Sequence, residues 1–191
     1  MNAKIYTDGG ARPTNPGHAG FACVVKLDDN TDHTISRYIG WHSNNIAEYY
    51  GAIVGIKYAK FLGATRITLL TDSQLVRNHI EGNWRVKQPE IRPLHGEIMK
   101  LLDDFDTWKV KWIERGKNQQ ADSYCTSAIY AGMLRNPFFL KRRNGHKNGV
   151  GEIDPFDGRA TSNIIMPQTA RYHLQSHARS LIMNINSTKQ T

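Results

Sequence analysis

Two short apolar segments of the sequence each end in Thr-Asp and then turn. The segment IYTDGG contains Asp8, and the segment LLTDSQ contains Asp72. An apolar run of this length is typical of a buried strand, where an aspartate is an unfavourable residue. If the two strands are parallel neighbours, the two carboxylates lie side by side at one edge of a sheet. This pair of acids therefore indicates a functional site.

Two predicted helices bring one further acid each toward the same edge. The first covers residues 45–62 and is apolar on almost all sides, so we expect it to be buried. Glu48 is the only charged member of one stripe of this helix, whose other members are small: Ala52, Gly55 and Ala59. Asp122 lies in about the first turn of the last predicted helix, in the segment KNQQADSYC.

Carboxylates that crowd together raise each other's pKa, and divalent cations remove this conflict. Sites rich in carboxylate oxygens suit Mg²⁺, and two such ions about 4 Å apart stabilise the attacking and leaving oxygens of a phosphodiester. Three of the acids also have simpler interpretations: Asp72 as a helix cap, Asp8 as a turn residue and Asp122 as a partner of the helix dipole. Glu48, in its apolar setting, is the hardest to explain without a cation.

The remaining pattern predicts an α/β fold with a five-stranded mixed sheet flanked by helices. Three antiparallel strands come first, and parallel strands follow. We expect strands at residues 3–7, 21–27, 33–40, 66–71 and 108–114. We expect helices at residues 45–62, 73–80, 94–105 and 119–134, the first capped by Asn44 or Asn45 and the last by Asn118. Residues 11–20, rich in Pro, Asn and Gly, are predicted to form a turn.

The composition indicates a cytoplasmic protein with an anionic partner. The 191 residues carry a net charge of +8 and have a pI of 9.6, which favours nucleic acid. No apolar run is long enough to span a membrane and no leader precedes the first predicted strand, so we expect neither membrane insertion nor secretion. Cys23 and Cys125 lie in apolar patterns and are expected to be buried thiols.

The charge divides the chain into two parts. Residues 1–135 carry 17 Lys and Arg against 14 Asp and Glu, whereas residues 136–191 carry 8 against 3. We expect one folded domain over residues 1–135 and a basic, partly irregular extension over residues 136–191. Apolar residues on one face allow a helix near residues 168–185. Either this helix packs on the domain or frays, or the extension lengthens a contact with phosphates through Lys141, Arg142, Arg143 and Lys147.

Four segments resemble, in order and spacing, the catalytic blocks of type 1 ribonuclease H: YTDGG, NNIAEYYGAIVGI, LLTDSQLV and NQQADSYC. The resemblance covers about residues 1–135. It implies a ribonuclease H-like fold and endonucleolytic cleavage of the RNA strand of an RNA–DNA hybrid. The family uses two Mg²⁺ (or Mn²⁺) ions and leaves 5′-phosphate and 3′-hydroxyl ends. We expect a monomer.

The resemblance also implies roles for individual residues. Asp8 is expected to bridge both ions. Glu48 and Asp72 are expected to hold the ion near the leaving group. Asp122 is expected to hold the ion that activates the attacking water.

Substrate contacts are implied in the same way. Asn44 and Asn45 resemble the pair that contacts the hybrid in its minor groove, where the 2′-hydroxyl distinguishes RNA from DNA. Ser43 matches a hydroxyl that often binds a DNA phosphate in the family. The loop over residues 9–20 is expected to bring its backbone near the same strand, through Gly9, Gly10 and Asn15.

Two features depart from the family pattern. Many members place a histidine in the loop before the last aspartate, but this loop is ERGKNQQAD here. Either Glu114 or Lys117 replaces the histidine, or the step runs without a dedicated group and with lower turnover. Many members also insert a long basic protrusion, and the corresponding segment EGNWRVKQPEIRPLHGEI is compact. Three residues of this segment either touch the DNA strand or belong to a solvated loop: Trp84, Arg85 and Lys87. In the second case the tryptophan is packed against the protein.

Two other functions are compatible with this fold. One is a module that binds hybrids or double-stranded RNA without catalysis, and the presence of all four acids argues against it. The other is a 3′–5′ exonuclease of the wider superfamily. The Asn-Asn-x-Ala-Glu helix and the TDGG block favour the endonuclease over the exonuclease.

Overall fold

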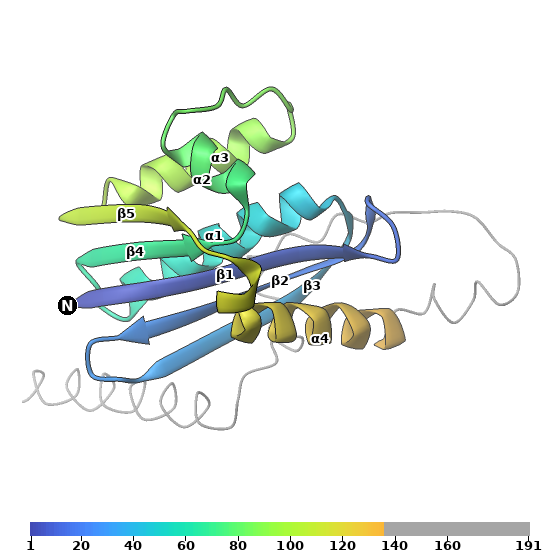
Figure 1. Ribbon diagram of the computed structural model, residues 1–191, viewed down its shortest axis with the longest axis horizontal. Helices are drawn as coiled ribbons and strands as arrows, with labels where there is room; N and C mark the ends of the chain where they lie inside the picture. Colours follow the sequence, from blue (N-terminus) through green and yellow to red (C-terminus); the bar gives the residue numbers. More distant parts are fainter. Residues whose placement is uncertain (136–191) are drawn as a thin grey trace, which may run out of the picture.

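The structure, a computed structural model, describes residues 1–135 (Figure 1). In chain order these residues form β1 (Asn2–Arg12), β2 (Gly17–Leu27), β3 (Asp32–His42), α1 (Asn44–Phe61), β4 (Arg66–Thr71), α2 (Gln74–Ile80), α3 (Ile91–Leu102), β5 (Thr107–Trp112), the short 3₁₀ helix η1 (Arg115–Lys117) and α4 (Gln119–Arg135). The predicted basic extension, with its helix near residues 168–185, lies outside the described residues.

The strands form one mixed sheet in the order β3-β2-β1-β4-β5. β2 pairs antiparallel with both β1 and β3, and β4 pairs parallel with both β1 and β5. The predicted fold, three antiparallel strands followed by parallel ones, is therefore confirmed. β1 is the central strand, so its side chains lie near the middle of the molecule (Figure 1).

Helices cover both faces of the sheet (Figure 1). α1 packs along β1 on one face and contacts α3, while α4 packs on β2 and β1 on the opposite face. The main core lies between α1 and the sheet, and it includes Ile5, Ile53 and Leu69. A smaller core joins α4 to the sheet through Cys125 and Ile129. Among the described residues, none of the helices combines the length and the apolar character that crossing a bilayer requires.

Small residues allow α1 to approach the sheet closely, as its stripe of alanine and glycine predicts. A Cβ atom added to Gly55 would lie 2.5 Å from Cγ2 of Ile5, which is fully buried. A Cβ atom added to Gly51 would lie 3.2 Å from the backbone oxygen of Asp8. This close contact holds the middle of α1 against β1.

The turn predicted over residues 11–20 is wrong at both ends. β1 continues to Arg12 and β2 begins at Gly17, so the connection is much shorter than its composition suggests. A Cβ atom added to Gly20, inside β2, would lie 2.8 Å from the side chain of Ile129 on α4. Glycine makes room for a helix here. From the sequence alone, such a glycine cannot be told apart from a glycine in a turn.

The predicted cap of α1 by Asn44 or Asn45 is also wrong. Ser43 is the N-cap, and its hydroxyl oxygen accepts a hydrogen bond from the backbone N–H of Ile46. Serine and asparagine are equally good caps. Asn44 is already helical, and its side chain accepts a hydrogen bond from the N–H of Ala11 instead.

Two later elements differ from their predicted bounds. α3 covers Ile91–Leu102 and not residues 94–105, so Pro93 lies in its first turn. Backbone N–H groups in the first turn have no partner within the helix, so proline loses no hydrogen bond there. β5 covers Thr107–Trp112 and stops before the end of the predicted strand over residues 108–114.

Candidate active site

Asp8 and Asp72 lie where the parallel pairing of β1 with β4 ends. The last register pair of the two strands is Thr7 with Thr71, and each aspartate is the next residue along its chain. Asp8 does not end its strand as predicted, because β1 remains paired with β2 as far as Arg12. The two carboxylates thus emerge together at the point where β1 continues beyond β4.

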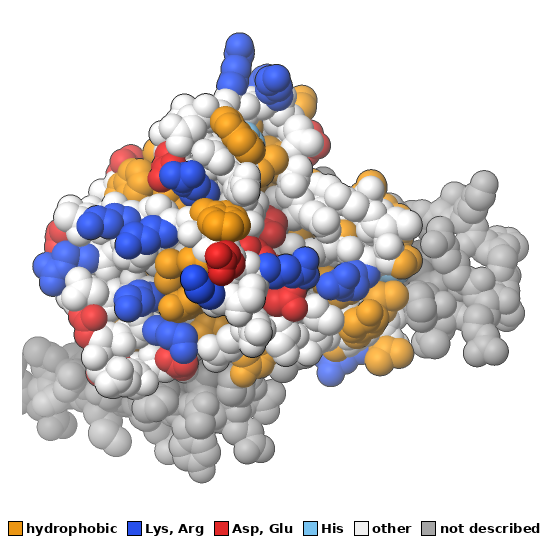
Figure 2. Space-filling model, in the orientation of Figure 1, with side chains coloured by type: hydrophobic (Ala, Val, Ile, Leu, Met, Phe, Trp, Pro, Cys, Tyr) orange, Lys and Arg blue, Asp and Glu red, His pale blue; other side chains and the backbone are white. Residues whose placement is uncertain are grey.

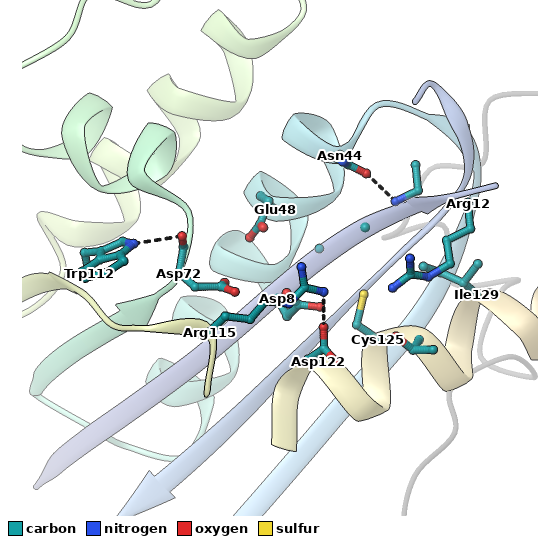
Figure 3. Close-up of a pocket in the computed structure, with 14 residues that line it drawn as sticks. Asp8, Arg12, Asn44, Glu48, Asp72, Trp112, Arg115, Asp122, Cys125 and Ile129 are labelled. Carbon is teal, nitrogen blue, oxygen red and sulfur yellow. Dashed lines mark hydrogen bonds and ion pairs between the residues drawn. The ribbon is translucent and has the colours of Figure 1, made fainter. Parts of the chain in front are cut away.

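Glu48 reaches the same point from α1. Gly9 permits this approach, because a Cβ atom added there would lie 2.1 Å from the backbone nitrogen of Glu48. One carboxylate oxygen from each of Asp8, Glu48 and Asp72 lies within 4.8 Å of the others. Figure 3 shows these three side chains directed at a common space. The structure therefore brings together three of the four predicted acids.

Burial and mutual repulsion perturb the charges of this group. Burial raises the pKa of Asp8 from 3.8 to about 6, and a hydrogen bond with Cys125 opposes the rise. The negative charges of Asp72 and Asp122 contribute to this rise, less than burial does. Burial also raises the pKa of Glu48 well above its ordinary value, and the nearby aspartates add to this rise.

Asp122 lies in the first turn of α4, as predicted, and lines the same cleft. Its carboxylate accepts a hydrogen bond of 2.7 Å from Nη2 of Arg115, a residue of η1 (Figure 3). Asp122 is therefore paired with this guanidinium and is not part of the group formed by the other three acids. The side chain of Arg115 is 70% exposed, and exposed ion pairs are weak, so Asp122 can exchange this partner for another cation.

Asn118 connects the strands that carry the aspartates. Its side chain is buried, and Nδ2 donates to the backbone oxygen of Thr7 at 2.8 Å and to the carboxylate of Asp72 at 3.1 Å. Its predicted role as a side-chain cap of α4 is wrong, since its side-chain oxygen accepts no hydrogen bond. The backbone oxygen of Asn118 accepts from the N–H of Asp122 instead. In the sequence, Asn118 stands out only as a candidate cap of the last predicted helix.

The acids lie in a surface cleft of about 350 Å³. Figure 2 shows acidic side chains near the middle of this face, with Lys and Arg side chains on both sides of them. The indole N–H of Trp112 donates to the backbone oxygen of Asp72 at 3.0 Å and fixes the wall of the cleft on the β5 side. Sequence reasoning missed several residues that line the cleft: Arg12, Trp112, Arg115 and Cys125.

The residues predicted to contact the hybrid form a hydrogen-bonded rim. The side chain of Asn44 accepts from the N–H of Ala11 at 2.6 Å, and the N–H of Asn44 donates to Oδ1 of Asn15 at 3.0 Å. Nδ2 of Asn45 donates to Gln88 at 3.4 Å. The first two bonds join the end of β1 and the turn after it to the first turn of α1, and the third joins α1 to the loop between α2 and α3. Of the predicted contact residues, three line the cleft: Gly9, Gly10 and Asn44.

The three residues predicted to touch the DNA strand, Trp84, Arg85 and Lys87, are exposed in the loop between α2 and α3. None of them lines the cleft. Trp84 is 48% exposed, so half of its surface is available to a ligand.

The two residues predicted as alternatives to the family's histidine point to solvent. Glu114 and Lys117 are 67% and 71% exposed, and their charged atoms pair with each other at 3.5 Å. Arg115, between them in the sequence, is the residue of this loop that lines the cleft.

The acidic group suits a divalent cation. Oε2 of Glu48 is buried and has no hydrogen-bond partner among residues 1–135. A buried carboxylate oxygen is unfavourable unless a donor or a cation satisfies it. Oxygen ligands of this kind suit hard divalent ions, so Asp8, Glu48 and Asp72 form a coherent donor set.

Comparisons with known proteins agree with this arrangement. Residues 6–128 match the family model described as Reverse transcriptase-like. The bifunctional protein Rv2228c of Mycobacterium tuberculosis is 37% identical over 133 residues, which cover 69% of this chain and 36% of that protein. Ribonuclease HI of Halobacterium salinarum is 34% identical over 125 residues, which cover 65% of this chain and 62% of that enzyme. The chain thus spans about a third of the length of the first relative.

Solved structures of ribonuclease H proteins are also similar to this chain. The N-terminal RNase H domain of Rv2228c has a TM-score of 0.67 and 35% identity, covering 70% of this chain and 97% of that one. LC11-RNase H1 in complex with an RNA/DNA hybrid has a TM-score of 0.64 and 30% identity, covering 69% of this chain and 99% of that one. A mixed sheet with a group of carboxylates at its centre places the chain among α/β proteins whose acids are arranged to suit a cation. The chain belongs to the ribonuclease H family.

Proposed function

We propose that the protein is an endonuclease that hydrolyses the RNA strand of RNA–DNA hybrids with two Mg²⁺ ions. The products are 5′-phosphate and 3′-hydroxyl ends. The observation that carries the proposal is the convergence of Asp8, Glu48 and Asp72, with an unpartnered oxygen of Glu48, in a chain of the ribonuclease H family. A similar solved protein, LC11-RNase H1, binds an RNA/DNA hybrid. Mn²⁺ suits the same oxygen ligands.

When bound, the two ions stabilise the charge on the attacking and leaving oxygens of the phosphodiester. The protein holds and orients the ligands for them. Asp8 lies between Asp122 on one side and the other two acids on the opposite side (Figure 3). This position supports the proposal that Asp8 would be a ligand of both ions when they are bound. Asn118 holds the carboxylate of Asp72 in one orientation through its hydrogen bond. Asp122 becomes available when it leaves Arg115.

Arg115 supplies a positive charge where the family often places a histidine. The hydrogen bond and charge of Asp122 raise the pKa of Arg115, so its guanidinium stays protonated at neutral pH. It therefore does not transfer protons. Its role in the proposed reaction is electrostatic: it pairs with Asp122 in the free protein and attracts phosphate at the cleft.

Recognition of the RNA strand is assigned to the rim of the cleft. Asn44 and Asn45 are placed at the start of α1, where their amides can meet the 2′-hydroxyls of a minor groove. The monomeric state and the cytoplasmic location remain predictions from the sequence.

An RNA–DNA hybrid labelled on its RNA strand tests the proposal. With Mg²⁺, the full chain is expected to cut the RNA at internal positions, and Asp8→Asn is expected to abolish the cuts. Asp106→Asn, a change at an exposed aspartate outside the cleft, is the matched control and is expected to cut normally. Binding without cutting would instead support the non-catalytic module. Digestion from the 3′ end alone would support the exonuclease.

A further inference from the structure

The cleft that contains the acids also holds a guanidinium with no ion-pair partner within residues 1–135. Arg12 is the last residue of β1 and lines the cleft that contains the acids. Its Nε is shielded from solvent and has no hydrogen-bond partner among the described residues. In Figure 3 its side chain runs from the end of β1 back toward Cys125 and Asp8. Residues 1–135 thus supply no acceptor that holds this Nε, so no hydrogen bond to Nε ties the guanidinium to the described part of the protein.

No acid within residues 1–135 forms an ion pair with Arg12. The other arginine of the cleft, Arg115, forms an ion pair with Asp122. Arg12 takes part in none of the ion pairs of the described residues. Its positive charge is therefore directed into the cleft and is available to an anion from outside.

We infer that Arg12 binds a phosphate of the RNA strand close to the phosphate that is cut, an inference that rests on the proposed hybrid cleavage. Arg12 follows Asp8 by four positions on the same strand, so their Cα atoms are about 13 Å apart at the usual rise per residue. The side chain points back over part of this distance. When one phosphate of a nucleic-acid strand lies at the acids, a neighbouring phosphate of the same strand therefore lies near the guanidinium.

The chemistry of the guanidinium suits this ligand. Its planar fork matches two phosphate oxygens at once, which a lysine ammonium does not do. Phosphate contacts fix register without reading sequence. Arg12 thus offsets the repulsion between the acids and the incoming backbone, and it positions the strand along β1. We expect its loss to affect KM more than kcat, because the contact is made equally in the bound substrate and in the transition state.

Arg12→Gln tests the contact by removing the charge while retaining a polar side chain of similar shape. For the full chain, KM for a hybrid is expected to rise about tenfold, with kcat changed less than about twofold. The slope of log affinity against log salt is expected to fall by about one unit, the value for one lost phosphate contact. Lys100→Gln, which removes an exposed cation of α3 outside the cleft, is the matched control and is expected to change neither quantity. An unchanged KM and salt slope in Arg12→Gln would overturn the inference.

Modified hybrids test whether the phosphate that Arg12 binds belongs to the RNA strand. Each hybrid carries one uncharged methylphosphonate linkage on a 2′-O-methyl nucleotide. The reference hybrids carry the same nucleotide with an ordinary phosphate. At one RNA linkage near the cut, the neutral linkage is expected to weaken binding by the unchanged protein and not by Arg12→Gln. Such non-additivity shows that the side chain and the phosphate interact. Additive losses at every RNA linkage, or coupling only to a DNA linkage, would refute the assignment.

Two further measurements separate the causes of a negative result. Arg12→Lys keeps the charge without the fork and is expected to bind with intermediate affinity, so it decides the question if Arg12→Gln fails to fold. Thermal melting followed by circular dichroism reports the fold of each variant. If the unchanged protein neither binds nor cuts hybrids, the proposed function itself fails. If it cuts them and Arg12→Gln behaves identically, only the role of Arg12 fails.

Discussion

Asp8 carries a negative charge inside the protein at the expense of stability. Burial and the neighbouring acids raise its pKa from 3.8 to about 6 in the folded state, so the folded protein binds this proton more tightly than the unfolded chain does. The free energy of unfolding therefore falls as the pH rises from about 4 to about 6, and it stays at the lower value above that range. A shift of about two pKa units corresponds to at most about 3 kcal/mol.

Asp8→Asn is accordingly expected to stabilise the metal-free protein at neutral pH. The amide is neutral at every pH, so the gain is about 2 kcal/mol at about pH 7.5 and small at about pH 4. Urea unfolding in EDTA measures both values, with Asp106→Asn as the exposed control. Equal gains at the two pH values would show that the charge is not the cause. Added Mg²⁺ is expected to stabilise the unchanged protein more than the variant, because a ligand stabilises the folded state that binds it.

Asn118→Ala is expected to lower both stability and turnover. The change leaves the buried oxygen of Thr7 without its side-chain donor and frees the carboxylate of Asp72. Loss of these bonds is expected to reduce the free energy of unfolding by about 1–3 kcal/mol. We expect kcat to fall about tenfold, with KM nearly unchanged, because a poorly oriented ligand affects the reaction more than substrate binding.

Unfolding curves, steady-state kinetics and Mg²⁺ titration by calorimetry check this prediction. Asn83→Ala removes an amide in the loop after α2 and is the control. Lower stability with normal kcat and normal Mg²⁺ affinity would restrict Asn118 to a structural role.

Sequence reasoning found the acids because their setting is unusual. A carboxylate that follows an apolar strand, or lies in an apolar helix stripe, contrasts with its neighbours, as at Asp8 and Glu48. Asn118 gave no such contrast, because an asparagine before a helix is also an ordinary cap. Arg12 and Arg115 lie in polar surroundings in the sequence, and only the folded chain shows that they face the acids.

At the scale of elements, the site depends on a strand that has two different pairing lengths. β1 pairs with β4 as far as Thr7 and with β2 as far as Arg12. The apolar run predicted the first limit correctly. It did not predict the second, because turn composition is a local signal whereas pairing depends on neighbours in space. The order and type of the elements, in contrast, follow from periodicity, and that order determined the predicted sheet.

The close contact of α1 with the sheet predicts opposite effects for two glycine substitutions. Gly55→Ala is expected to destabilise the protein by about 1–3 kcal/mol, because its Cβ would lie 2.5 Å from Ile5 and 3.2 Å from Cys23 in a filled core. Gly96→Ala, in α3, meets no atom within 4 Å and is expected to stabilise by about 0.5–1 kcal/mol. Urea unfolding of both variants measures the difference. Similar values for the two would mean that the core yields to the added methyl group.

At the scale of the whole molecule, the charge is concentrated away from the described domain. Residues 1–135 carry 17 basic against 14 acidic residues, a net charge of +3, and residues 136–191 carry 8 against 3, a net charge of +5. The acids of the cleft add to repulsion of a nucleic acid. Cations elsewhere in the chain are therefore needed for association, and the extension holds most of the excess.

A chain that ends at residue 135 is expected to keep its kcat within about twofold and to bind hybrids more weakly. Residues 1–135 contain the acids and a hydrophobic core, so we expect the chemistry to proceed without the extension. KM is expected to rise about tenfold, and the salt dependence of binding is expected to flatten because fewer counterions are released. A full-length variant in which four cations are changed to glutamine separates charge from length: Lys141, Arg142, Arg143 and Lys147. This variant is expected to show the same rise in KM and the same flatter salt dependence as the truncated chain. If neither the truncation nor the four substitutions changed the salt dependence of binding, the extension would make no contact with the phosphate backbone.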